Sequence, residues 1–161
     1  MQHQMLEPEI DLLNVLLKGE ISAVESYDAA LPRVNESSVA DILQQCRASH
    51  YFRAERLRST ISESGGEPIC DAGPWGSFAK MVTQAAGSVG DKAIISALEE
   101  GEDIGSNTYE WKLRDMKGEN RNLIRDELWP KQKATHKLIS KLAQQALRGE
   151  WPPTPEPNLE A

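Results

Sequence analysis

One short pattern occurs twice in this chain of 161 residues, and it constrains the fold more than any other feature. A glycine–glutamate pair is followed seven residues later by a tyrosine, at Gly19-Glu20 with Tyr27 and, 82 residues on, at Gly101-Glu102 with Tyr109. A second echo follows each copy, Arg47-Ala48-Ser49-His50 and Lys133-Ala134-Thr135-His136, displaced by 86 residues. Two matches in the same order predict an internal repeat, a duplicated helical hairpin. The repeat brings two glutamates and two histidines to symmetry-related positions.

Apolar residues recur at three- and four-residue spacing over four long stretches, the pattern of amphipathic helices. We expect these helices over residues 7–34, 37–64, 91–116 and 119–147. Gly65-Gly66 should end the second helix, and Pro130 should kink the fourth. The sequence therefore predicts an all-α protein.

The connection between the second and third helices is unusually long. Residues 67–90 contain loop signals and a short apolar segment from Trp75 to Val82, whose Trp75 and Phe78 we expect to pack across the bundle. Such a length is needed when the chain must cross the whole bundle between two helices. We expect one four-helix bundle over residues 1–148, with a short helix in its crossover. Residues 149–161 form a proline-rich tail that should be extended or disordered.

Two carboxylates interrupt otherwise apolar helix faces. Glu20 lies on the same stripe as Leu16 and Val24, and Glu102 lies between Leu98 and Tyr109. His50 falls on the core line of the second helix, and His136 on that of the fourth. Because charged side chains are almost never fully buried unless paired, these positions point to a metal site or a buried polar network.

Charge narrows the range of partners. The formal net charge is −7, whereas the phosphate backbone of nucleic acids favours clustered lysine and arginine. No apolar run approaches the roughly 20 residues of a membrane span, and the N-terminus lacks the basic and apolar regions of a signal peptide. Two cysteines do not make a disulfide framework. We expect a cytoplasmic protein that binds neither nucleic acid nor membrane.

These motifs resemble the ferritin-like di-iron proteins, in which two helices each give one Glu and two others each give a Glu-x-x-His pair. More closely, the chain resembles a family of small bacterial ferritin-like proteins catalogued as a domain of unknown function, the DUF2383 type. The segments that carry this resemblance are Leu16–Glu20 with Tyr27, Ser64–Pro68, Gly73–Phe78, and Leu98–Asp103 before Tyr109. The resemblance implies a ferritin-like bundle, a lost or modified metal centre, and, by analogy of fold, a homodimer.

The chain departs from the di-iron pattern at the bridging positions. Three residues before each histidine stand Arg47 and Lys133 instead of glutamate. A cation there would repel a divalent metal. The sequence therefore favours a structural polar core in which Arg47 and Lys133 pair with the glutamates, and the histidines bond to Glu or to the hydroxyls of Tyr27 and Tyr109.

The alternative is a single iron or zinc ion bound by four ligands, with Glu99 as a possible further oxygen ligand. Those four ligands would be Glu20, His50, Glu102 and His136. If the head groups of Arg47 and Lys133 point into the layer, the structural network is favoured. If they extend outward, space for a metal remains. We expect a protein without enzymatic activity in a structural, stress-related or interaction role; the alternative function is metal binding.

Overall fold

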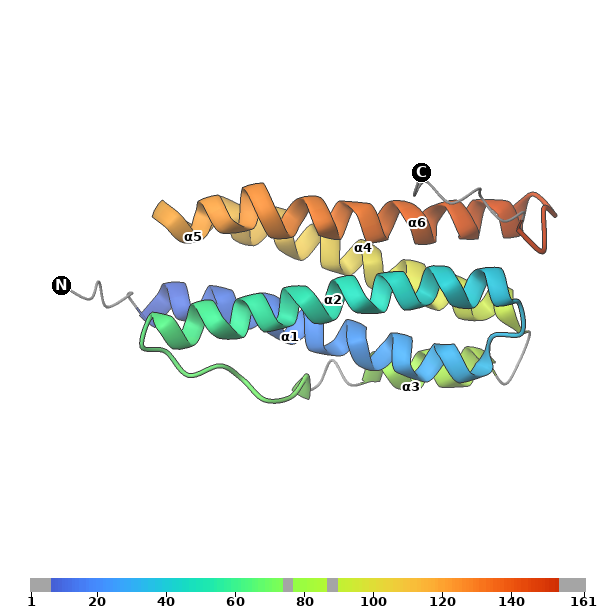
Figure 1. Ribbon diagram of the computed structural model, residues 1–161, viewed down its shortest axis with the longest axis horizontal. Helices are drawn as coiled ribbons and strands as arrows, with labels where there is room; N and C mark the ends of the chain where they lie inside the picture. The colour runs from blue at the N-terminus through green and yellow to red at the C-terminus, as the bar shows by residue number, and fades with distance from the viewer. Residues whose placement is uncertain (1–6, 74–76, 87–89, 154–161) are drawn as a thin grey trace.

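The computed structural model describes residues 7–73, 77–86 and 90–153, and every regular element within those ranges is helical. The elements, shown in Figure 1, are α1(Glu7–Ala30), η1(Leu31–Arg33), α2(Ser37–Glu63), α3(Ser77–Ala86), α4(Asp91–Asp115), α5(Gly118–Leu123), η3(Ile124–Leu128) and α6(Trp129–Leu147). The predicted all-α bundle is confirmed.

The long helices form two antiparallel hairpins that pack against each other (Figure 1). α1 packs against α2, and α4 packs against α6; α1 also contacts α4, and α2 also contacts α6. α2 and α4 run in the same direction, so the connection between them returns along the bundle. α3 lies within this return and packs on both α1 and α4.

Glycine and proline residues end the first two long helices close to the predicted positions. α2 ends at Glu63, and Gly65 adopts a φ of +80°, which lets the N–H of Gly66 reach the carbonyl of Ile61 at 2.9 Å. α1 ends at Ala30, four residues earlier than predicted, because the segment that contains Pro32 tightens into the 3₁₀ turn η1.

The predicted kink at Pro130 takes the form of a π-helical turn. η3 joins α5 to α6, and the N–H of Trp129 donates to the carbonyl of Ile124, five residues back. Pro130 has no N–H, and its ring would clash with the carbonyl four residues earlier. The wider turn removes this clash while the helix continues.

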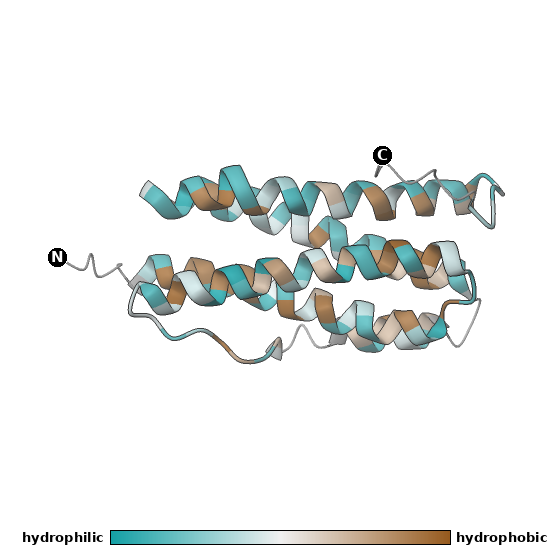
Figure 2. Ribbon diagram, viewed as in Figure 1, coloured by the Kyte–Doolittle hydropathy of each residue, from teal (hydrophilic) through white to brown (hydrophobic). Residues whose placement is uncertain are grey.

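Two apolar clusters fill the bundle, one towards each end. The first includes Leu13, Leu17, Leu57, Leu113 and Leu128; the second includes Leu43, Ile94, Ile95, Ile139 and Leu142. Hydrophobic residues accordingly recur along the whole length of each long helix in Figure 2. Buried polar side chains lie between the two clusters and are described below.

The beginning of the tail is better packed than the sequence suggests. Trp151 is half-buried against the second apolar cluster, and Pro153 is buried. These residues have no regular secondary structure, and they contact the bundle because an indole ring gains free energy by covering apolar surface. Residues 154–161, Trp75 and the side chain of Phe78 lie outside the described parts. Within the described ranges, no helix is long and apolar enough to cross a membrane.

The buried carboxylate of Asp91, at the start of α4, accepts hydrogen bonds from the connection between α1 and α2. It accepts the backbone N–H of Asn35 at 3.0 Å, the N–H of Glu36 at 3.1 Å and the Asn35 side-chain amide at 3.1 Å. Asp91→Ala should lower the free energy of unfolding by about 2–3 kcal/mol, because these donors lose a charged acceptor. Urea denaturation would measure this loss. Asp41→Ala, at an exposed position on α2, is the matched control and should change stability by less than about 0.5 kcal/mol.

Candidate functional site: a buried ion-paired layer

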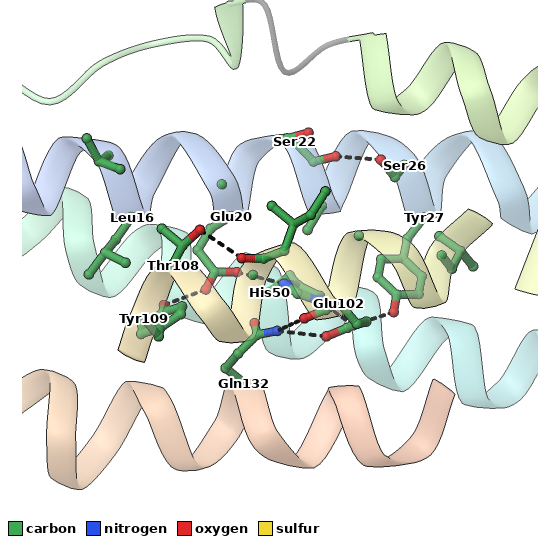
Figure 3. A pocket seen from close by; sticks show the side chains of 17 residues that line it. Leu16, Glu20, Ser22, Ser26, Tyr27, His50, Glu102, Thr108, Tyr109 and Gln132 are labelled. Carbon is green, nitrogen blue, oxygen red and sulfur yellow. Dashed lines mark hydrogen bonds and ion pairs between the residues drawn. The ribbon is translucent and has the colours of Figure 1, made fainter. Parts of the chain in front are cut away.

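Two tyrosines and two glutamates form a reciprocal arrangement across α1 and α4. The Tyr27 hydroxyl on α1 donates to Glu102 Oε1 at 2.6 Å, and the Tyr109 hydroxyl on α4 donates to Glu20 Oε1 at 2.5 Å. The helices are antiparallel, so a tyrosine two turns beyond one glutamate reaches the other (Figure 3). Both glutamates are buried: Glu20 is 2% exposed and Glu102 is 3% exposed.

His50 joins the two carboxylates. Its Nδ1 lies 2.7 Å from Glu20 Oε2, and its Nε2 lies 2.8 Å from Glu102 Oε1. A carboxylate oxygen can only accept, so both ring nitrogens must donate, and His50 is an imidazolium. Arg53 Nη2 also lies 2.6 Å from Nδ1; this is a contact between two cations, because Nδ1 has no lone pair left.

Arg53, which is fully buried on α2, supplies the second positive charge. Its Nε donates to Glu20 Oε1 at 2.7 Å, its Nη1 donates to Ser49 Oγ at 2.9 Å, and its Nη2 donates to Gln132 Oε1 at 2.9 Å. A guanidinium can be buried when its donors meet charged or polar acceptors, and here all three nitrogens do.

Glu102 is completed by α6. Gln132 Nε2 donates to Glu102 Oε2 at 2.9 Å, and Thr135 Oγ1 donates to the same oxygen at 3.0 Å. Gln132 therefore accepts from Arg53 and donates to Glu102, which links α2 to α4 through α6. Four charged side chains and the two polar side chains that bond to Glu102 together form what we call the polar layer. Its members are Glu20, His50, Arg53, Glu102, Gln132 and Thr135.

Opposite charges keep Glu20, Glu102 and His50 in their ionised forms. Burial raises the pKa of Glu20, but the charges of Arg53 and His50 outweigh it and lower that pKa to about 2. Burial likewise opposes ionisation of Glu102, whose pKa is lowered chiefly by His50. Burial and Arg53 lower the pKa of His50, yet Glu102 and Glu20 together raise it above its ordinary value. Two anions and two cations leave the layer neutral.

The neighbouring acidic groups stay protonated. Burial, followed by the charge of Glu102, raises the pKa of the Cys46 thiol to about 12. Burial also raises the pKa of Tyr27 and of Tyr109 well above the usual range, and each adjacent glutamate adds to the effect. A thiolate or phenolate nucleophile is therefore not formed here near neutral pH.

Four predicted members lie outside the polar layer. Arg47 pairs with Asp28 at the surface, and Lys133 stacks its ammonium 4.0 Å from the ring centre of Trp129. His136 contacts Asp103 at 2.6 Å with a third of its side chain exposed. Glu99 is half-buried, and none of the hydrogen bonds found within the described ranges joins it to the layer. The structure brings Glu20, His50, Glu102, Tyr27 and Tyr109 together in the core. It places Arg47, Lys133 and His136 towards the surface instead of in the core, where the sequence predicted them.

Arg53, Gln132 and Thr135 were not predicted from the sequence. Once the structure has placed His50 and Arg53, the displacement of 82 residues pairs His50 with Gln132 and Arg53 with Thr135. The 86-residue displacement of the second echo matched letters and shifted the fourth helix by about one turn. Each half thus supplies one pair of side chains, spaced by three residues, to the carboxylate of that half.

The arrangement does not suit a metal ion. Within the described ranges, no group of three or more His, Cys, Asp or Glu side chains is placed to hold one. Both nitrogens of His50 carry protons, and a ligating imidazole needs a free lone pair. The Arg53 guanidinium also lies against Glu20, where a divalent ion would be repelled.

The fold and the polar layer define this protein as an all-helical bundle whose centre is held by buried ion pairs. The chain belongs to the family described as Domain of unknown function (DUF2383), whose model matches residues 8–115, from α1 to the end of α4. No curated protein and no solved structure matches the chain.

The charged state of His50 predicts how stability depends on pH. The pKa of His50 is raised on folding, so its contribution is present below about pH 6.5 and is lost as pH rises through the folded value. Glu20 contributes above about pH 4.5 and loses its contribution as pH falls towards 2. The free energy of unfolding should therefore fall between pH 6 and pH 9, as measured with urea.

His50→Gln should remove that fall. His136→Gln should retain it, because an exposed pair contributes little. A wild-type stability that is constant from pH 6 to pH 9 would contradict the imidazolium assignment.

A matched pair of glycine substitutions tests the packing of Gln132. A Cβ at Gly105 would lie 2.8 Å from Gln132 Nε2, whereas one at Gly19 meets no atom within 4 Å. Gly105→Ala should lower the free energy of unfolding by about 1–2 kcal/mol, because displacing Gln132 costs more than the gain in helix propensity. Gly19→Ala should raise it by about 0.5–1 kcal/mol. Equal effects of the two substitutions in thermal melts would refute this role of Gln132.

Proposed function

We propose that this protein is a ferritin-like bundle in which buried cations stand where related di-iron proteins hold metal, and that it acts without catalysis in a structural, stress-related or interaction role. One observation carries the proposal: the four oxygens of Glu20 and Glu102 receive hydrogen bonds from six protein side chains. The donors are Tyr27, His50, Arg53, Tyr109, Gln132 and Thr135. A metal ion would have to displace several of them.

The internal repeat supports the ferritin-like assignment. Each half contributes a glutamate, a tyrosine that reaches the other half, and two polar side chains three residues apart. We infer that the pairs His50/Arg53 and Gln132/Thr135 take the positions of the two Glu-x-x-His pairs of di-iron bundles. Both pairs have lost the carboxylate, and one has gained a guanidinium.

The outward positions of Arg47 and Lys133 do not free space for a metal. Each was expected to supply the buried cation, and each lies at the surface. Arg53, nearly two turns further along α2, takes that role for Glu20. A cation therefore still pairs with each carboxylate: Arg53 with Glu20, and His50 with Glu102.

A polar layer of this kind favours a unique arrangement of helices more than it adds stability. A shift of one helix by one turn would separate His50 from a carboxylate and leave a buried charge unpaired. We propose that the layer fixes the register of the four long helices, so that the surface presented to partners is constant.

The remaining parts of the proposal concern assembly and location. We propose a cytoplasmic bacterial protein that forms a homodimer and binds no nucleic acid, in keeping with the net charge of −7. Trp111 on α4 is 62% exposed, and apolar exposure of this kind suits a dimer contact.

Metal content and metal rescue test the central claim. Protein purified without chelator and loaded anaerobically with ferrous iron or zinc should hold less than about 0.1 metal ion per chain by elemental mass spectrometry, since a ligating imidazole must be deprotonated. Arg53→Ala should lower the free energy of unfolding by roughly 3–5 kcal/mol, because Glu20 loses its buried partner. Zinc should raise the melting temperature of this variant and leave the wild type unchanged.

The contrary result is equally definite. About one metal ion per wild-type chain, lost in a folded Glu20→Ala/Glu102→Ala variant, would replace the structural proposal with a metal-binding function.

A further inference from the structure

A cavity of about 50 Å³ lies between α1 and α4, directly against the polar layer (Figure 3). Its floor consists of buried polar side chains, among them Glu20, His50, Glu102 and Tyr109. Its mouth is lined by small or apolar residues that are partly exposed: Val15, Gly19, Ala23, Gly101, Ile104 and Gly105. Gly19 leaves part of the opening unfilled, because a Cβ built there would meet no atom within 4 Å.

Of the four carboxylate oxygens on the floor, Glu20 Oε2 has spare accepting capacity. Each carboxylate oxygen can accept about two hydrogen bonds. Glu20 Oε1 accepts from Arg53 and Tyr109, whereas Glu20 Oε2 accepts from His50 alone among the hydrogen bonds found in the described ranges. Both oxygens of Glu102 accept two each. Glu20 Oε2 is therefore the carboxylate oxygen that can accept a further hydrogen bond from a molecule in the cavity, which Glu20 lines.

The volume limits what can enter. A cavity of about 150 Å³ holds one benzene molecule. Benzene has six non-hydrogen atoms, so such a cavity provides about 25 Å³ for each of them. The 50 Å³ here then accommodate about two such atoms, the size of a terminal hydroxymethyl group. The rest of a longer molecule must lie in the mouth, where Val15 and Ile104 offer apolar surface.

The charge of the layer selects a neutral donor. His50 and Arg53 already balance Glu20 and Glu102, so an additional cation would be buried without a compensating anion. Burial of an unpaired ammonium costs far more than burial of a hydroxyl that makes one hydrogen bond.

We propose that this cavity binds the terminal hydroxymethyl group of an unbranched aliphatic alcohol, whose O–H donates to Glu20 Oε2 and whose hydrocarbon chain lies between Val15 and Ile104. This site goes beyond the structural role proposed above. It assigns the protein a small-molecule ligand of a defined class.

The test is a titration at pH 6 followed by ¹H–¹⁵N NMR, with 1-butanol as the probe and butyl methyl ether and n-butylamine as comparisons. The amides of Gly19, Gly101 and Gly105 should show saturable shifts with 1-butanol, with a Kd on the order of 1 mM for so small a ligand. The ether, which cannot donate, and the charged ammonium should each bind at least tenfold more weakly. Equal binding of the ether would overturn the role of Glu20, and no saturation with 1-butanol would overturn the site.

Two variants and a control complete the experiment. Gly19→Leu, which fills the cavity, should abolish the shifts at Gly101 and Gly105, whereas Ala48→Leu, on the exposed face of α2, should retain them. Val15→Ser removes apolar surface from the mouth without touching the polar layer, and it should weaken 1-butanol binding several-fold even if Gly19→Leu does not fold. Undiminished binding to folded Gly19→Leu or to Val15→Ser would refute the placement of the alcohol.

Discussion

The structure depends on the balance of charge inside the bundle, where Glu20 and Glu102 face His50 and Arg53. Each of these four charges lies between the apolar clusters and would lower the free energy of unfolding by several kcal/mol if it were unpaired. The geometry of their pairing therefore decides whether they stabilise or destabilise the fold. Here every charge meets an opposite charge within 2.8 Å. Because the four groups come from α1, α2 and α4, none can be satisfied until those helices are docked in register.

The same balance determines the chemistry that remains possible. Protonation of both His50 nitrogens removes the imidazole as a ligand, and the high pKa of Cys46 removes the thiol as a nucleophile. What is left at the centre is a neutral, hydrogen-bonded layer whose Glu20 also lines a small cavity.

The helices and their order could be predicted from the sequence because apolar periodicity and glycine or proline punctuation are local signals. Glu20, Glu102 and the two tyrosines could also be predicted, since a repeated polar interruption of an apolar face is visible without coordinates. Arg53 could not be predicted by this route. Arg47 and Arg53 lie about 60° to either side of His50 on the helix, so periodicity permits either one to enter the core.

The sequence by itself therefore determined the fold class, the long return between α2 and α4, and the carboxylates at the centre, because each depends on spacing along one chain segment. Only the tertiary structure decided which cations meet those carboxylates. The choice between Arg47 and Arg53, or between His136 and Gln132, depends on the side from which a neighbouring helix approaches. That approach is a property of packing among helices, and no single helix encodes it.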